Sequence, residues 1–164
     1  MTKRVLLITI PIVLIIALIL FKNSKKTLPQ KWIRLERDTS GYVFYSPCEE
    51  TPNYTNIEGN LLIISGEPDD PDTLKTLSTT QLSADKYEIK CKGKEYGLLI
   101  KIRWLDNAHT TALWRFHYDN KNYPADSKAV MCPADKKAGF KVVKCIPNDT
   151  VKTAELQFLP IEEN

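Results

Sequence analysis

The chain has 164 residues, of which 43% are hydrophobic, and it carries a formal net charge of +3. Five basic side chains lie within the first 26 residues, whereas residues 27–164 hold 18 basic against 20 acidic side chains. The larger part is therefore faintly acidic and lacks the positive surface that nucleic-acid binding requires, so we expect no nucleic-acid partner. Residues 27–164 suffice for one domain with its own core and are too few for two.

The first predicted element is an apolar run over residues 5–21, in which 14 side chains are Ile, Leu, Val or Phe and none is charged. As a helix this run would extend about 26 Å, close to the hydrocarbon thickness of about 30 Å. We therefore predict a transmembrane signal-anchor at 5–21 behind a cytoplasmic tail at 1–4. Residues 21–26 offer no small-residue pair at the spacing of a cleavage site, which favours an uncleaved anchor over a cleaved signal peptide.

The orientation of this anchor follows from two opposing signals. A count of basic residues favours a cytosolic C-terminal domain, because only two side chains, Lys3 and Arg4, precede the run and more basic residues follow it. Short N-terminal tails, however, usually stay in the cytoplasm, and long C-terminal domains cross the membrane with little regard to charge. We expect a single-pass protein of the cell membrane, with its domain in the periplasm or outside the cell. A cytosol-facing domain with reduced thiols is an alternative.

Residues 22–30 read as a polar tether, and residues 31–164 as one β-rich domain. Short apolar runs separated by Gly, Pro, Asn and Asp are typical of antiparallel strands. One short helix is predicted over Asp70–Leu77, with Asp70 as its cap and Pro71 at its first position. The fold class is mainly β, either a sandwich or a rolled sheet, with at most one or two short helices. Strands are predicted at 31–37, 42–46, 53–57, 61–65, 86–92, 97–105, 111–119, 128–132, 140–146 and 151–159.

The strongest local signal is a hairpin over Leu98–Tyr118. On both of its strands the apolar side chains fall on even-numbered residues and so share one face. An even sum of residue numbers keeps apolar residues opposite apolar residues across the pair. We predict the register with sum 218, which pairs Ile100 with Tyr118, Ile102 with Phe116, and Trp104 with Trp114.

The opposite face of this hairpin is basic. It carries Lys101, Arg103, Arg115 and His117, and the same register sets Arg103 opposite Arg115. A like-charge pair is destabilising unless an anion, a carboxylate or solvent lies between the two groups. This face is either an ordinary solvated surface or a site for an anion or an acidic partner.

The four cysteines, Cys48, Cys91, Cys132 and Cys145, all follow the anchor. Their wide spacing does not suit a zinc site, whereas their even number suits two disulfides, which require an oxidising compartment. We favour a Cys132–Cys145 bridge across a hairpin turn at Ala138–Gly139, which leaves Cys48 with Cys91. Three connectivities remain open.

Candidate sites for chemistry are few. The chain has two histidines, His109 and His117, and it has neither a nucleophile-elbow motif nor a glycine-rich phosphate loop. An acidic segment lacks the ligand order of a calcium loop, so we predict no metal site there. It is either a solvated acidic turn, which is the favoured interpretation, or a candidate loop for contact with a partner. That segment contains Glu67, Asp69, Asp70 and Asp72. We accordingly predict no catalytic residue and no cofactor.

These features favour a non-enzymatic function. We expect a membrane-anchored extracytoplasmic binding module that contacts the bilayer through residues 5–21 and binds a protein or another component of the envelope, with an envelope protein as one candidate partner. An envelope inhibitor or an immunity-type protein is a specific form of this hypothesis. The alternative from another class is an envelope hydrolase whose site is assembled from separate loops.

Overall fold

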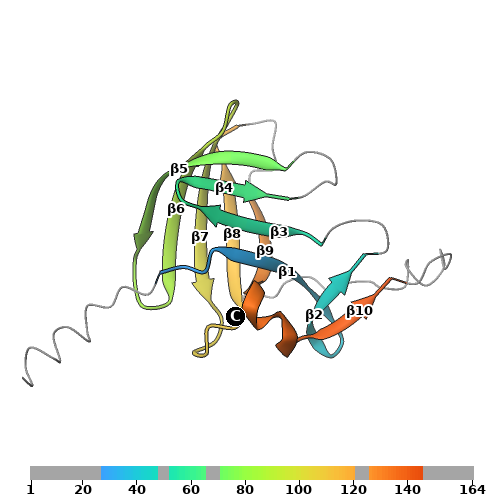
Figure 1. The fold of residues 1–164 in the computed structure, drawn as a ribbon. Coiled ribbons are helices and arrows are strands. Elements are labelled where there is room, and N and C mark those ends of the chain that lie inside the picture. The colour runs from blue at the N-terminus through green and yellow to red at the C-terminus, as the bar shows by residue number, and fades with distance from the viewer. Residues whose placement is uncertain (1–26, 48–51, 66–70, 121–125, 146–164) are drawn as a thin grey trace, which may run out of the picture.

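The structure is a computed structural model that describes residues 27–47, 52–65, 71–120 and 126–145 (Figure 1). The predicted tail, the predicted anchor, and the predicted strand at 151–159 lie outside these ranges. Among the described residues, no helix is both long and apolar enough to cross a membrane.

The described residues form ten strands and one short 3₁₀ helix. Nine of the ten predicted strands are confirmed, and their ends agree within two residues. The elements are β1 (Lys31–Asp38), β2 (Gly41–Ser46), β3 (Tyr54–Glu58), β4 (Leu61–Ile64), β5 (Asp72–Gln81), β6 (Lys86–Lys92), β7 (Gly97–Trp104), β8 (Ala112–Tyr118), β9 (Asp126–Pro133), η1 (Ala134–Gly139) and β10 (Lys141–Lys144).

Eight of these strands close into an antiparallel barrel. Their order is β1-β3-β4-β5-β6-β7-β8-β9, and β9 pairs back with β1 through Leu35 and Val130 (Figure 1). Closure leaves none of these eight described strands as a free outer strand of the barrel, because the first and last of them pair with each other. Of the two predicted architectures, the rolled sheet is therefore the one that forms.

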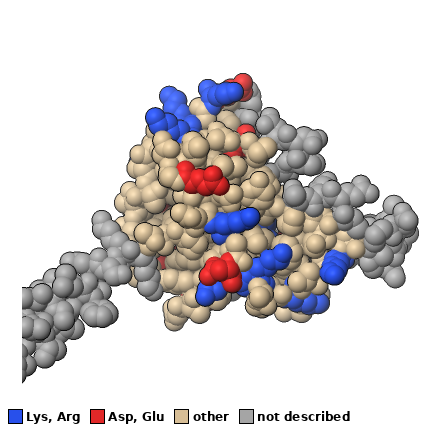
Figure 2. Space-filling model, in the orientation of Figure 1, with Lys and Arg blue, Asp and Glu red and all other residues tan. Residues whose placement is uncertain are grey.

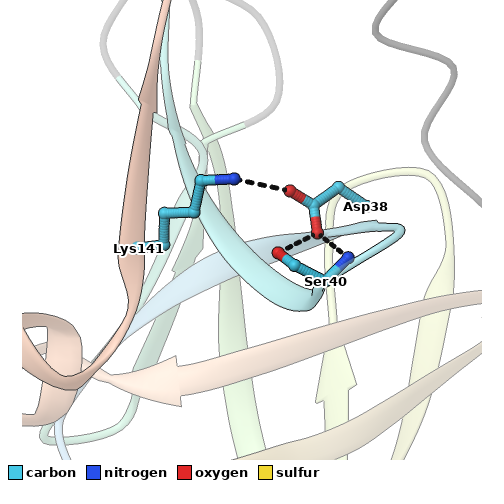
Figure 3. Close-up of polar contacts among 3 residues, drawn as sticks. All are labelled: Asp38, Ser40 and Lys141. Atoms are coloured by element: carbon cyan, nitrogen blue, oxygen red, sulfur yellow. Dashed lines mark hydrogen bonds and ion pairs between the residues drawn. The ribbon is translucent and has the colours of Figure 1, made fainter.

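Strands β2 and β10 lie outside the barrel and form a flap. β2 continues from β1 through a tight turn, and β10 runs parallel to β2 with Lys144 opposite Ser46. The Asp38 carboxylate accepts hydrogen bonds from the Ser40 amide at 2.7 Å and the Ser40 hydroxyl at 2.6 Å, and it pairs with Lys141 Nζ at 3.3 Å (Figure 3). Asp38 therefore joins the β1–β2 turn to β10.

The barrel interior is filled with side chains. Trp32 is fully buried, and its ring centroid lies 5.1 Å from those of both Trp104 and Trp114. His109 adopts a positive φ of 55° and stacks on Trp104 at 4.6 Å with an angle of 6° between the rings. Aromatic clusters of this kind bury large areas of apolar surface. The tryptophans thus form the centre of a packed core.

A second, smaller core lies between the outside of the barrel and the flap. Leu113 and Val130 point outward from the barrel wall and are covered by Phe44 of β2 and by Phe140 after η1. This layer explains why β8 and β9 carry apolar side chains on both faces.

The predicted register of the central hairpin has the correct parity but is wrong by two residues. Trp104 lies opposite Ala112, and Ile102 opposite Trp114, so the sum is 216 rather than 218. The loop fixes this register, because the Leu105 amide donates to the Thr111 carbonyl at 2.9 Å and extends the pairing by one step. The large Trp104 side chain thereby faces a small residue within the crowded interior.

Two further predictions are wrong. Residues 72–77 of the predicted helix belong to β5, because Leu74 pairs with Leu62 of β4 and the Thr-rich part pairs with β6, while Asp70 lies outside the described residues. β-branched threonines favour this extended state. The predicted hairpin at Ala138–Gly139 is also absent, since η1 occupies this segment and β10 pairs with β2 rather than β9.

Candidate anion-binding groove

The basic face of the central hairpin lies on the outside of the barrel. Register places Lys101 opposite Arg115, whereas Arg103 faces Leu113 on one side and Lys86 on the other. The predicted Arg103–Arg115 pair is therefore wrong. The cause is the same two-residue difference in register, and a like-charge pair still results.

Cross-strand pairing concentrates positive charge on this face. Three pairs of basic residues lie directly opposite each other, namely Lys86 with Arg103, Lys101 with Arg115, and Arg115 with Lys128. Each such pair costs a few tenths of a kcal/mol, so together the cost is on the order of 1 kcal/mol. All these side chains alternate with buried residues along their strands and point away from the barrel core.

Acidic side chains offset this charge in part. Glu88 lies opposite Lys101 and pairs with Lys90 at 3.6 Å. Asp85, at the β5–β6 turn, accepts a hydrogen bond from the Ser83 hydroxyl at 2.6 Å, which lowers the pKa of Asp85, and nearby Lys86 and Arg103 contribute to the same shift. Basic groups still outnumber these two carboxylates on the face.

Four of the basic residues line one groove. This groove has a volume of about 420 Å³ and is bounded by Lys86, Lys101, Arg103 and Arg115, with Leu82 and Leu113 beside them. Leu113 is buried, and Leu82 is 58% exposed. We call this feature the basic groove. Its combination of cationic rim and leucine side chains fits an anionic group attached to an apolar body.

The charge on the described surface is not basic everywhere. Figure 2 shows one face of the molecule, which is mostly uncharged, with Lys and Arg side chains lying among Asp and Glu. Directly opposed basic pairs occur three times on the outside of β6–β9, and once more between β5 and β6, where Lys75 lies opposite Lys92.

Of the four residues predicted for the basic face, the structure brings three together in the basic groove, namely Lys101, Arg103 and Arg115. His117 lies on the same outer face, opposite Leu99, and does not line the basic groove. Lys86 was missed by the sequence analysis. Its outward position follows from the buried Tyr87 and Ile89 in the same strand, but its place beside Arg103 depends on the β6–β7 register.

The predicted partner loop is described only at its end. Glu67, Asp69 and Asp70 lie outside the described residues. Asp72 begins β5 and accepts a hydrogen bond from the Tyr96 hydroxyl at 2.8 Å. Asp72 is therefore part of a strand, and its carboxylate is hydrogen-bonded to the connection between β6 and β7.

The loop that contains His109 is held together by hydrogen bonds to one carboxylate. Asp106 accepts hydrogen bonds from the amides and hydroxyls of both Thr110 and Thr111, at distances between 2.5 and 3.0 Å. Burial alone would raise the pKa of Asp106, but these hydrogen bonds outweigh it and lower the pKa to about 2. An acid of that strength is a poor proton acceptor at neutral pH, so Asp106 does not suit a general base.

The cysteines do not form the favoured bridges. Cys91 and Cys132 are free and buried, so the predicted pairs Cys132–Cys145 and Cys48–Cys91 are wrong. Burial raises the pKa of both free thiols, that of Cys132 to about 11. Cys132 belongs to the second core together with Val130, which lies two residues earlier on the same face of β9, and β10 pairs with β2 rather than with β9. Cys145 is disulfide-bonded, and Cys48 lies outside the described residues.

The chemistry available in the basic groove is recognition of an anion. Guanidinium groups bind carboxylates and phosphates through paired N–H donors, and an ammonium group adds a compact positive charge. Among the described residues, no cluster of His, Cys, Asp and Glu could hold a metal ion. Neither a protein-family model, nor a curated protein, nor a solved structure matches the chain.

Proposed function

We propose that the protein is a single-pass, membrane-anchored binding module whose barrel lies on the extracytoplasmic side and recognises an anionic group in the basic groove. The anchor is the apolar run at residues 5–21. The observation that carries the binding role is the row of opposed like-charge pairs around a groove of about 420 Å³.

The energetic argument concerns the cost of this charge. Within each opposed pair the two positive charges repel each other, and for the three pairs together this repulsion is on the order of 1 kcal/mol. An anion that binds between the basic side chains reverses the sign of this contribution. Binding should therefore stabilise the folded barrel, whereas an ordinary solvated surface would show only general screening by salt.

An anionic group can also belong to an envelope protein, as in an inhibitor or an immunity-type protein. In that form of the proposal, Asp or Glu side chains of the partner enter the basic groove. The arginines then supply bidentate contacts, and Leu82 supplies exposed apolar area beside them.

The hydrolase alternative has weaker support from the described residues. His109 is stacked on Trp104, and the neighbouring Asp106 carboxylate is engaged by two threonines. Neither group lines the basic groove. A hydrolase would need a base and a nucleophile that face a common substrate position.

The test uses the full chain in detergent with inorganic phosphate as the probe. Phosphate should raise the melting temperature in a saturable manner, beyond the effect of sodium chloride at the same ionic strength. The double variant Arg103→Gln, Arg115→Gln should lose this difference, and the matched control Lys144→Gln, on β10, should retain it. Equal effects of phosphate and chloride on the unmodified protein would refute an anion site.

A further inference from the structure

The basic groove lies beside the point where the tether joins the barrel. Thr27 and Leu28, the first described residues, line a second groove of about 590 Å³ together with residues 79–83 of β5 and its turn. Leu82 and Tyr87 line both this groove and the basic groove. Figure 1 shows the segment that leads into β1 passing beside the β5–β6 hairpin. Because two residues line both grooves, the grooves share one corner of the barrel.

The length of the tether limits how far this corner can lie from the membrane. The apolar run ends at Phe21 and the described structure begins at Thr27, six residues later. Six residues extend at most about 20 Å. The headgroup layer itself occupies roughly 5–8 Å on each side of the hydrocarbon. The corner that carries the basic groove therefore lies within reach of the lipid headgroups.

Exposed leucines mark the same end of the barrel. Leu82 in the β5–β6 turn is 58% exposed, and Leu105 after β7 is 38% exposed. The two connections are joined by a hydrogen bond from the Trp104 amide to the Asp85 carbonyl at 2.9 Å. Leu105 follows Arg103 on the outward-facing side of the β7 chain. Apolar and basic side chains are thus adjacent, as at surfaces that bind the bilayer interface.

We infer that the basic groove binds the phosphate-bearing headgroup of an anionic lipid in the same membrane that holds the anchor, with Leu82 and Leu105 entering the interface. This inference rests on the proposed function, because it needs both the anchor and the anion site. A folded partner of 100 residues has a diameter of about 30 Å, which exceeds the reach of the tether. The space between barrel and bilayer therefore suits a headgroup better than a second protein.

The test places a polarity-sensitive fluorophore at Leu82→Cys in the full chain, reconstituted into vesicles that contain brominated phosphatidylcholine. Cys91 and Cys132 are buried and should not react in the folded protein. The fluorophore should be quenched when half of the lipid is phosphatidylglycerol, and much less in phosphatidylcholine alone. A control fluorophore at Val142→Cys, an exposed position on β10, should remain unquenched in both.

Removal of charge from the basic groove should weaken docking. Each basic residue near an anionic surface contributes about a fivefold change in association, so Arg103→Gln with Arg115→Gln should lower the docking equilibrium about 25-fold. Lys144→Gln should have little effect. If the double variant does not fold, Lys86→Gln at an exposed position tests the same point with a fivefold change.

The outcomes separate this inference from the proposed function. A chain that fails to float with any vesicle refutes the anchor. A chain that floats, but shows equal quenching at positions 82 and 142 or normal docking in the arginine variant, refutes the lipid site alone. Occupation of the basic groove by a polyglutamate peptide, without docking to phosphatidylglycerol vesicles, assigns the site to an acidic protein and also overturns the inference.

Discussion

Trp32→Ala tests whether the barrel interior is a packed core or a ligand cavity. Trp32 is 0% exposed, and its ring lies 5.1 Å from two other indoles. Truncation of a buried tryptophan removes its transfer free energy and leaves a cavity, and together these cost about 3–5 kcal/mol. The loss of aromatic contacts is included in that range. We therefore expect a large decrease in the free energy of unfolding.

The assay is urea denaturation followed by far-ultraviolet circular dichroism, because the substitution changes the tryptophan fluorescence itself. Leu61→Ala, at a residue that is 38% exposed, is the control and should cost less than about 1 kcal/mol. A decrease of under about 1 kcal/mol for Trp32→Ala would refute the reasoning. It would show that the interior tolerates an empty volume, which would favour ligand binding inside the barrel over binding in the basic groove.

Three other predictions concern the cysteines, a loop and the flap. In protein taken from cells and unfolded without reductant, alkylation should modify two cysteines, Cys91 and Cys132. After reduction, alkylation should modify all four cysteines. Modification of all four cysteines without reductant would indicate a cytosolic domain. Because the pKa of Asp106 is lowered from 3.8 to about 2, its contribution to stability is present above pH 4 and is lost as the pH falls towards 2. Melting curves of the protein and of Asp106→Asn should therefore differ at pH 6 and converge at pH 2, and a constant difference would contradict this explanation. Asp38→Ala should speed hydrogen exchange in β10 and leave exchange in β7 unchanged, whereas uniform acceleration would indicate global destabilisation.

Strand alternation alone predicted which residues of the central hairpin face the core. Ile102 and Trp114 are buried, and Lys101 and Arg115 point outward, as their odd and even positions require. Alternation could not predict the register, because pairings in which opposite residue numbers sum to 216 or to 218 place the same side chains on the same face. Hydrogen bonds of the loop at Asp106 select between them.

Local propensity was less informative where strands lie far apart in the chain. Residues after Asp70 resemble the start of a helix, but pairing with β4 and β6 extends them into β5. The parallel pairing of β10 with β2 joins segments from opposite ends of the domain, and no short-range pattern indicates it. The incorrect cysteine pairing followed from this same error.

The sequence by itself determined the apolar run, the β-rich class and the two faces of each strand, since these depend on the order of residues along a single element. Tertiary structure decided the closure of the barrel, the position of Lys86 beside Arg103 and the state of the thiols. The physical reason is that these properties depend on which strands become neighbours, and neighbours are chosen by packing of the whole core.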